Sequence, residues 1–316
     1  MSKPAKGADV GAGAGAAKGA GAARAFQGYL AKYVLAALLF SVGASIFLYP
    51  AVSALINERA QTVVVRTYNE AVQETPRAVK EISLEQARAY NLSLVGRQPQ
   101  LLDPFDDAHF RDSSVVTYLK IGDVMGYVEV PKIGITVPIY EGTSDAVLSK
   151  GVGWIPETSL PVGGESTHTV LSGHNGLPTA RLFTDINKLE PGDEFFIRNF
   201  AEILAYRVYD IQVVEPHEVE IAGIVTGKDL ATLLTCYPYM VNSHRLLVTG
   251  ERVAYTGQLD KAPRGLNPLE DLTPVERNFV VTLTVVLGLL ALLVVLAILL
   301  HRRRRRRGNR GKADGS

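Results

Sequence analysis

The stretch Thr232-Leu233-Leu234-Thr235-Cys236 and the stretch Arg245-Leu246-Leu247-Val248 decide the fold of this chain. Both are short runs rich in apolar and β-branched residues, and the segment 237–244 between them contains Pro238. Such a pattern predicts two neighbouring strands joined by a tight connection. Cys236 then ends the first strand and Arg245 begins the second, so the connection brings a thiol and a guanidinium together.

Further runs of this kind occur between Gly, Pro and Asp residues, and Glu190-Pro191-Gly192-Asp193 is a strong turn signal. We interpret Gly151-Val152-Gly153-Trp154 as another turn. The pattern predicts an all-β closed barrel of about eight strands over residues 124–256. The remaining expected strands lie at 127–130, 135–140, 168–172, 194–198 and 204–214.

Two apolar runs flank this region, within 34–55 and 279–301, and neither contains Asp, Glu, Lys or Arg. Each is long enough, at about 1.5 Å per residue, to cross a hydrocarbon core of about 30 Å. We therefore expect two flanking transmembrane helices. The first run is longer than a usual signal-peptide core, which favours its retention as a signal anchor. Ala51-Val52-Ser53-Ala54 nevertheless offers small residues that a signal peptidase accepts.

The segments outside the barrel have distinct compositions. Residues 1–33 are rich in Gly and Ala with scattered Lys, and we expect a disordered basic tail. Residues 56–98 have weak helical periodicity, and Pro76 divides them into two N-terminal helices. Residues 99–123 and 257–278 are expected to be linkers, and residues 302–316 a second basic tail.

Charge is strongly segregated along the chain. Residues 1–55 carry five basic groups and one acid, and residues 279–316 carry eight basic groups and one acid. Residues 56–278 hold 20 basic and 30 acidic residues. The positive-inside rule therefore predicts a protein of the cell membrane with both termini cytoplasmic and the barrel extracellular. The arginines of 302–307 directly follow a span, so we interpret them as a stop-transfer anchor and expect no nucleic-acid partner.

Cys236 is the only cysteine, and it lies in a region predicted to face an oxidising compartment. A thiol attacks carbonyl groups as thiolate, and a free cysteine has a pKa near about 8.5. His174 provides a base or a cationic neighbour, and Arg245 provides fixed donors for an oxyanion. The set indicates thiolate acyl transfer. One cysteine and scattered histidines lack metal-ligand spacing, so we expect no metal and no cofactor.

Thr232-Leu233-Leu234-Thr235-Cys236 resembles the TLxTC signature of sortases, the cysteine transpeptidases of Gram-positive surfaces. Leu171-Ser172-Gly173-His174-Asn175-Gly176 and the Arg245 stretch match the same family, in the same order. The similarity covers roughly residues 100–255. It implies that Cys236 is the nucleophile, His174 the acid and base, and Arg245 the substrate-stabilising residue. His168 is expected to be structural or pocket-lining, and His244 to point away from the thiol.

Leu102-Asp103-Pro104-Phe105 resembles the lid of class C sortases, which assemble pili. The resemblance implies that Asp103 pairs with Arg245, that Phe105 covers Cys236, and that Pro104 shapes the turn between them. Together with the second span, it implies a class C enzyme within residues 99–256. The alternative for this segment alone is an ordinary turn that begins at a proline.

The resemblance implies a membrane-anchored enzyme that cleaves LPxTG-like sorting signals and joins pilin subunits through a lysine isopeptide bond. Its partners are then pilins and the membrane. The alternative with the same chemistry is a housekeeping sortase that attaches proteins to peptidoglycan. Two further alternatives are a non-catalytic adhesin or pilin and a general thiol protease. A pilin is expected to carry its own LPxTG motif before the last span, and residues 262–278 contain none.

Overall fold

The computed structural model describes residues 12–97, 103–105, 119–178, 180–257 and 278–289. It divides the chain into two compact units. One comprises residues 1–49 and 285–316, and the other comprises Pro50–Thr284 and holds the barrel and the candidate site.

Two helices precede the barrel, as predicted, and they are separated at Pro76. Helix α1 is Ala12–Glu74 and helix α2 is Arg77–Leu94. Proline ends a helix because the residue before it is pushed towards extended backbone. The helix α1 also includes residues 12–33, which the composition predicts to be disordered. Alanine, the residue with the highest helix propensity, is abundant there and accounts for the difference.

One helical stretch among the described residues, Leu39–Glu74 of α1, is long and apolar enough to cross a membrane. The mean hydropathy of its most apolar window is 1.9. A shorter apolar helix, Asn278–Leu289, begins where the second span is predicted. The rest of that predicted span and the basic tail lie outside the described residues.

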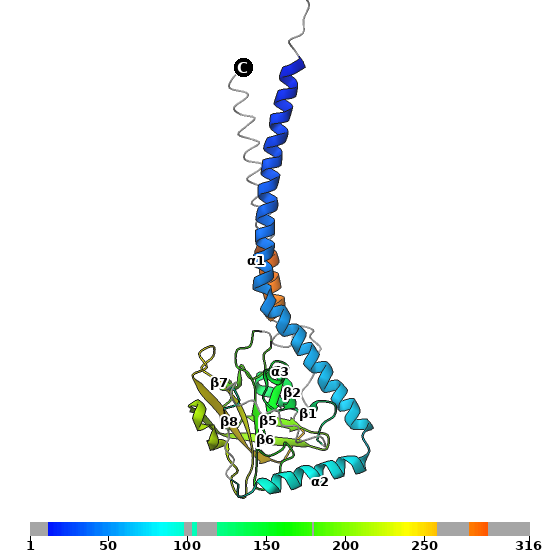
Figure 1. The fold of residues 1–316 in the computed structure, drawn as a ribbon, viewed down its shortest axis with the longest axis vertical. Coiled ribbons are helices and arrows are strands. Elements are labelled where there is room, and N and C mark those ends of the chain that lie inside the picture. The colour runs from blue at the N-terminus through cyan, green and yellow to red at the C-terminus, as the bar shows by residue number, and fades with distance from the viewer. Residues whose placement is uncertain (1–11, 98–102, 106–118, 179, 258–277, 290–316) are drawn as a thin grey trace, which may run out of the picture. The chain divides into compact units, whose positions relative to one another are not determined.

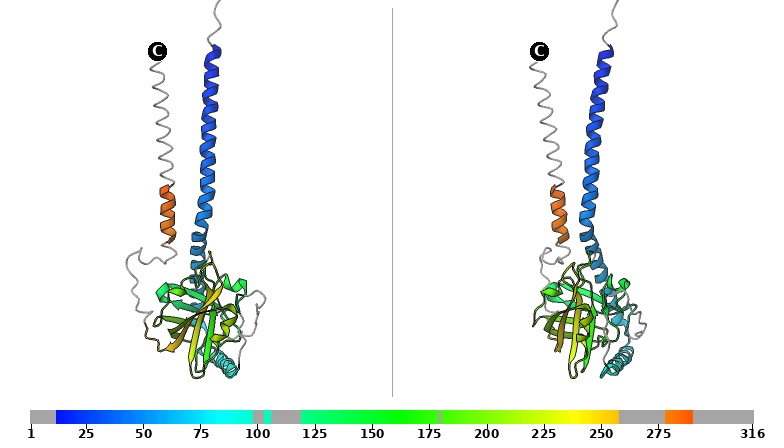
Figure 2. Two further views of the ribbon diagram at one scale, coloured as in Figure 1. Left: turned by 90° about the vertical axis from the view of Figure 1, so that its left-hand side faces the viewer. Right: turned by 60° about the vertical axis from the view of Figure 1, so that its left-hand side comes forward.

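Eight strands form a closed barrel in the order β1-β2-β3-β4-β7-β8-β6-β5, which confirms the predicted all-β barrel (Figure 1). Figure 2 shows the barrel from two further directions, with α2 beside it in each. The strands are β1 (Val124–Val130), β2 (Ile135–Glu141), β3 (Val152–Trp154), β4 (Thr167–Ser172), β5 (Glu194–Arg198), β6 (Ile203–Val214), β7 (Asp229–Tyr237) and β8 (His244–Val253).

Strand β3 corrects one prediction, because its residues were expected to form a turn. It pairs with β2 in parallel and with β4 in antiparallel orientation. Gly153 lies so close to the carbonyl oxygen of Gly142 that a side chain there would collide with it. The glycine that suggested a turn therefore permits close backbone approach within the sheet.

Four short helices lie between the strands. They are the 3₁₀ helix η2 (Pro131–Ile133), α3 (Asp145–Leu148), the 3₁₀ helix η3 (Ile186–Lys188) and the 3₁₀ helix η4 (Pro216–Ala222). Helix η4 follows β6 and precedes β7, so it lies in the chain between the two strands that border β8.

Alternation along the strands separates two apolar clusters. Leu233 belongs to the main core, whereas its neighbour Leu234 belongs to a second, smaller cluster. Successive side chains of a strand point to opposite faces, so the second cluster lies on the other face of the sheet. We call it the outer cluster. Its members are Ile155, Val170, Val214, Val219, Ala222, Leu234 and Leu247.

Helix α2 packs against the barrel through buried apolar side chains, Ala87 and Leu94 among them, and through one buried amide side chain. The Asn91 side chain donates to the Leu160 carbonyl at 3.2 Å and accepts from the Leu160 amide at 2.7 Å. Asn91 is 2% exposed. The Leu160 carbonyl also accepts from Thr169 Oγ1 at 3.1 Å, so it is the buried Leu160 amide that depends on Asn91.

We expect Asn91→Leu to lower the free energy of unfolding by about 1–3 kcal/mol, because it leaves the buried Leu160 amide without an acceptor. Denaturation of the detergent-solubilised chain, followed by circular dichroism, measures the change. Leu92→Ala is the control, since Leu92 is 69% exposed and adjacent. Equal stability of the two variants would show that this pair does not hold α2.

Candidate active site

Cys236 and Arg245 are direct cross-strand partners in the antiparallel pair β7–β8. Cys236 is two residues from Leu234 on β7, and Arg245 is two residues from Leu247 on β8. Side chains two residues apart on a strand share a face, so both side chains lie on the face of the outer cluster. Cys236 is 7% exposed and Arg245 is 6% exposed. The short connection between the strands places the guanidinium and the thiol side by side, as the sequence predicts.

His174 reaches the same edge because β4 and β7 run in parallel. Ser172 pairs with Leu234, so His174 and Cys236 each lie two residues beyond this pair. Hydrogen bonds hold the end of β4 to β7: the Gly173 amide donates to the Leu234 carbonyl at 3.0 Å, and Thr235 Oγ1 donates to the Gly173 carbonyl at 2.6 Å. The histidine and the cysteine therefore approach the site on adjacent strands.

Asp103 occupies the guanidinium of Arg245. Arg245 Nε donates to Asp103 Oδ1 at 2.8 Å and Nη2 donates to Oδ2 at 2.6 Å, a bidentate pair. The remaining nitrogen, Nη1, donates to the backbone carbonyls of Asn242 and His244 at 3.0 and 2.9 Å. All three nitrogens of the buried Arg245 are thus engaged, and the implied contact between Asp103 and Arg245 is present.

Phe105 contacts both His174 and Arg245. Its ring centroid is 5.6 Å from that of His174, and the Arg245 guanidinium carbon is 5.3 Å from the Phe105 ring. Phe105 also packs against the outer cluster, and Pro104 is buried. The described lid residues 103–105 therefore lie over the edge at which the three predicted site residues meet.

Burial dominates the protonation of the site in this arrangement. It raises the pKa of Cys236 to about 11; Arg245 opposes the rise and Asp103 adds to it. Burial also lowers the pKa of His174, against the influence of Asp145 at the start of α3. The thiol and the imidazole are thus both neutral near pH 7 while Asp103 holds Arg245. A neutral thiol is a poor nucleophile, and we call this arrangement, with Asp103 on Arg245, the resting arrangement.

The outer cluster forms an apolar floor beside Cys236. Val219 and Ala222 belong to η4, and Leu234 and Leu247 belong to β7 and β8. The cluster is contiguous with Phe105, which covers part of it.

The other histidines near the site have different surroundings. His168 is buried, with Nδ1 2.7 Å from the Gly223 carbonyl oxygen and Nε2 2.7 Å from Thr232 Oγ1. It fastens the end of η4 to β7. His244 contacts Ser243 Oγ through Nδ1 at 2.8 Å. Within the described part of the chain, no group of three His, Cys, Asp or Glu side chains is placed to hold a metal ion.

Two residues that act on the candidate site, Asn175 and Asp145, were not predicted from the sequence. Asn175 Nδ2 donates to the Cys236 carbonyl at 2.7 Å. Asp145 acts on the pKa of His174 from a different element, α3. Asn175 follows His174 directly, but its partner lies 61 residues away, so no local pattern reveals the bond.

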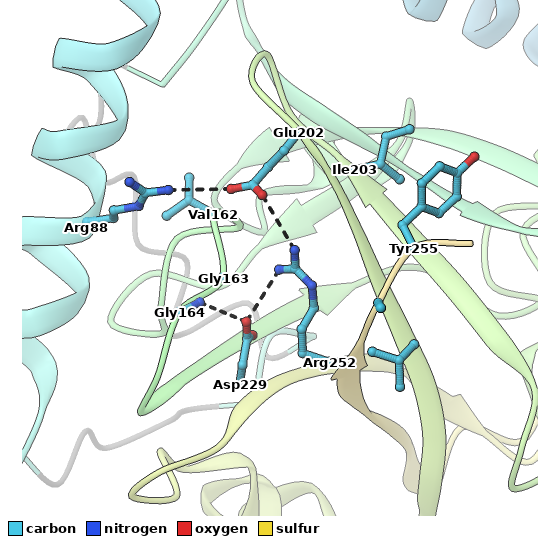
Figure 3. A pocket seen from close by; sticks show the side chains of 11 residues that line it. Arg88, Val162, Gly163, Gly164, Glu202, Ile203, Asp229, Arg252 and Tyr255 are labelled. Atoms are coloured by element: carbon cyan, nitrogen blue, oxygen red, sulfur yellow. Dashed lines mark hydrogen bonds and ion pairs between the residues drawn. The ribbon is translucent and has the colours of Figure 1, made fainter. Parts of the chain in front are cut away.

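A polar pocket of about 550 Å³ lies at the start of β7, away from the end that carries Cys236 (Figure 3). Arg252 bridges Asp229 at 3.4 Å and Glu202 at 3.6 Å, and Arg88 of α2 approaches Glu202 at 3.6 Å. Its four charged groups balance one another, and none of them belongs to the candidate active site.

Comparison with known proteins gives one family. Residues 128–253 match the sortase domain. The structure is similar to Streptococcus pneumoniae sortase C, with 44% identity and a TM-score of 0.58 over 61% of this chain and 97% of that one. It is also similar to the Group B Streptococcus Pilus Island 1 sortase C2, with 49% identity and a TM-score of 0.54 over 57% of this chain and all of that one.

Curated relatives give the same family at lower identity. Sortase D of Bacillus subtilis is 32% identical over 136 residues, which are 42% of this chain and 65% of that protein. Sortase A of Bacillus anthracis is 28% identical over 130 residues, 60% of its length. The match spans less than two thirds of these curated relatives. The chain belongs to the sortase family, whose members are cysteine transpeptidases.

Removal of the lid anchor should move the titration of Cys236 to lower pH. We expect Asp103→Ala to lower the thiol pKa from about 11, because the variant removes a negative charge and leaves Arg245 uncompensated. The alkylation rate near pH 7.5 then rises, since a larger fraction of the thiol is ionised. The measurement is the rate of alkylation by a small thiol reagent between pH 6 and pH 11.

Asp193→Ala is the control, because Asp193 pairs with Lys132 at 2.8 Å and is not among the groups that shift the Cys236 pKa. Identical alkylation profiles for Asp103→Ala and the wild type would show that Asp103 does not govern the thiol.

Proposed function

We propose that this protein is a membrane-anchored class C sortase that cleaves LPxTG-like sorting signals and polymerises pilin subunits through isopeptide bonds. The observation that carries the proposal is the bidentate pair of Asp103 with Arg245, beside Cys236. The carboxylate of a lid occupies the two donors that would bind an oxyanion. A lid over these donors is the feature that favours pilus assembly over peptidoglycan anchoring.

The reaction begins when the lid residues leave the edge. Arg245 Nε and Nη2 then lose their carboxylate, and the thiol regains water and a free neighbouring cation, so its pKa falls. His174 accepts the thiol proton, and the Cys236 thiolate attacks the threonine carbonyl of the sorting signal. The sulfur–carbon bond forms, and the two Arg245 donors stabilise the oxyanion.

His174 completes acylation as a general acid. It donates a proton to the glycine nitrogen as the carbon–nitrogen bond breaks, and the signal's C-terminal part departs as an amine. The product is a thioester on Cys236. A lysine amine of another pilin then attacks the thioester carbonyl, His174 removes one of its protons, and the thiolate leaves. The new bond is an amide, so the peptide bond energy is conserved through the thioester.

The apolar floor supports a signal that begins with leucine and proline. Val219, Ala222, Leu234 and Leu247 offer apolar contacts along the strands that lead to Cys236. A leucine side chain buried there contributes about 1.5–3 kcal/mol of transfer free energy. The titles of two similar solved structures refer to pilins or pilus islands, which supports a pilin as the substrate.

The apolar stretch of α1 supports the membrane anchor. Exposed apolar side chains follow one another along it, which suits contact with lipid rather than water. They include Leu35, Leu39, Val42, Ile46 and Phe47, all more than half exposed. We propose that residues 34–55 and 279–301 both span the membrane, with the barrel outside and both termini in the cytoplasm.

Loss of the thiol should abolish the reaction without unfolding the barrel. We expect no detectable cleavage of an LPxTG-type peptide by Cys236→Ala, and nearly as severe a loss in His174→Ala. Peptide cleavage and the transfer product are followed by mass spectrometry. Substantial turnover by Cys236→Ala would refute the assignment of the nucleophile.

Arg245→Lys separates charge from geometry. Lysine retains the positive charge but loses the planar pair of donors, Nε and Nη2, that Asp103 occupies. We expect a fall in kcat of about 10²-fold, the usual result of removing one oxyanion donor. A lysine variant with near wild-type kcat would mean that Arg245 acts by charge alone.

The topology is tested with reporter fusions. A reporter at Ser316 and a reporter within residues 257–278 should give opposite sidedness, because the predicted second span lies between them. A fusion at Ser316 that reports from outside would contradict the two-span arrangement.

A further inference from the structure

Asn175 extends the parallel pairing of β4 and β7 beyond the end of β4. The Gly173 amide donates to the Leu234 carbonyl, and two residues further the Asn175 side chain donates to the Cys236 carbonyl at 2.7 Å. The carboxamide therefore takes the place that a backbone amide would fill in a longer strand. It is fixed directly beside the backbone of the nucleophile.

The oxygen of the same carboxamide has no partner. Asn175 is 8% exposed, and its Oδ1 is inaccessible to solvent and meets no hydrogen-bond donor in the part of the chain that the structure describes. A buried acceptor without a donor costs the free energy of its lost hydration. Because Nδ2 is fixed by Cys236, the orientation of Oδ1 is fixed as well. The structure thus holds an oriented acceptor without a donor on the side chain that binds the backbone of the nucleophile.

The chemistry at Cys236 supplies a matching donor. A primary amine that attacks a thioester carries two hydrogens: one is transferred to a base as the carbon–nitrogen bond forms, and the other remains in the amide. In the reverse direction, the scissile amide nitrogen keeps its hydrogen and gains one from an acid. His174 donates or accepts the transferred proton, so the retained N–H requires a separate acceptor.

We propose that Asn175 Oδ1 accepts the retained N–H of the reacting nitrogen, both in the scissile amide and in the incoming lysine amine. The proposal rests on the acyl transfer proposed above and assigns a further substrate-binding residue to it. Asn175 thereby orients the nitrogen lone pair relative to the carbonyl carbon.

The test compares two substrates of the full-length enzyme in detergent. One is an LPxTG-type peptide, and the other is the same peptide with glycolate in place of the scissile glycine, so that an ester oxygen replaces the N–H. Acylation is measured as the single-turnover release of the leaving group. We expect Asn175→Ala to slow acylation by the amide about tenfold more than acylation by the ester, the effect of one hydrogen bond to the reacting group.

Two variants separate Oδ1 from Nδ2. Asn175→Asp keeps oxygen acceptors but loses the donor to the Cys236 carbonyl that orients them, so it should slow both substrates while retaining most of the ratio of the amide rate to the ester rate. Asn175→Leu matches the shape of asparagine without its polar atoms. If the alanine variant unfolds, the leucine variant should show the same fall in the amide rate relative to the ester rate. Ser172→Ala removes another buried side-chain oxygen that lacks a partner among the described residues, and it should leave the ratio unchanged.

The outcomes are distinct. Equal slowing of amide and ester in Asn175→Ala, or no slowing of either, would overturn the proposal and leave Asn175 as a structural residue at most. A wild type that acylates with neither substrate would refute the proposed acyl transfer itself. A ratio that falls in Asn175→Ala and Asn175→Leu and is retained in Asn175→Asp would establish the role.

Discussion

A buried guanidinium requires an anion, and the site is organised around this requirement. Arg245 is 6% exposed and is fixed by backbone carbonyls of the β7–β8 connection. Removal of one partner from a buried ion pair is strongly unfavourable because the remaining charge loses both its partner and water. Asp103 provides the anion in the resting arrangement, and the oxyanion of acyl transfer provides it during the proposed reaction. In the proposed reaction, the substrate oxyanion therefore replaces the Asp103 carboxylate on Arg245 when the lid departs.

The protonation of the thiol follows from the same exchange. The carboxylate of Asp103 offsets part of the stabilisation that Arg245 gives the thiolate, and burial keeps Cys236 protonated. His174 is likewise held neutral under the Phe105 ring. An enzyme whose nucleophile is ionised only in the open arrangement is protected from oxidation and from unproductive hydrolysis between turnovers. The protection requires no additional residue, since the anion that compensates Arg245 also covers the edge.

Much of this arrangement can be predicted from the sequence. The strands around Cys236 and Arg245 are rich in β-branched and apolar residues, and their antiparallel pairing follows from a short connection. The contact of Asp103 with Arg245 spans 142 residues and was expected only through family resemblance. Strand β3 differs from the predicted turn because its glycine serves close packing within the sheet. Helix α1 includes residues 12–33 although they offer little apolar surface to bury, because alanine favours helix by its own propensity. Asn175 and Asp145 were not assigned because their partners are distant in sequence.

The parallel pairing of β4 with β7 has a consequence for how such enzymes diversify. The chain between His174 and Cys236 leaves one strand, builds β5, β6 and η4, and returns to the neighbouring strand. Helix η4, which borders the apolar floor, lies inside this excursion. Its length and composition can change without altering the spacing of the histidine and the cysteine, because the β-ladder sets that spacing and the crossover does not. The composition of η4 and the spacing of His174 and Cys236 are therefore determined by separate parts of the chain.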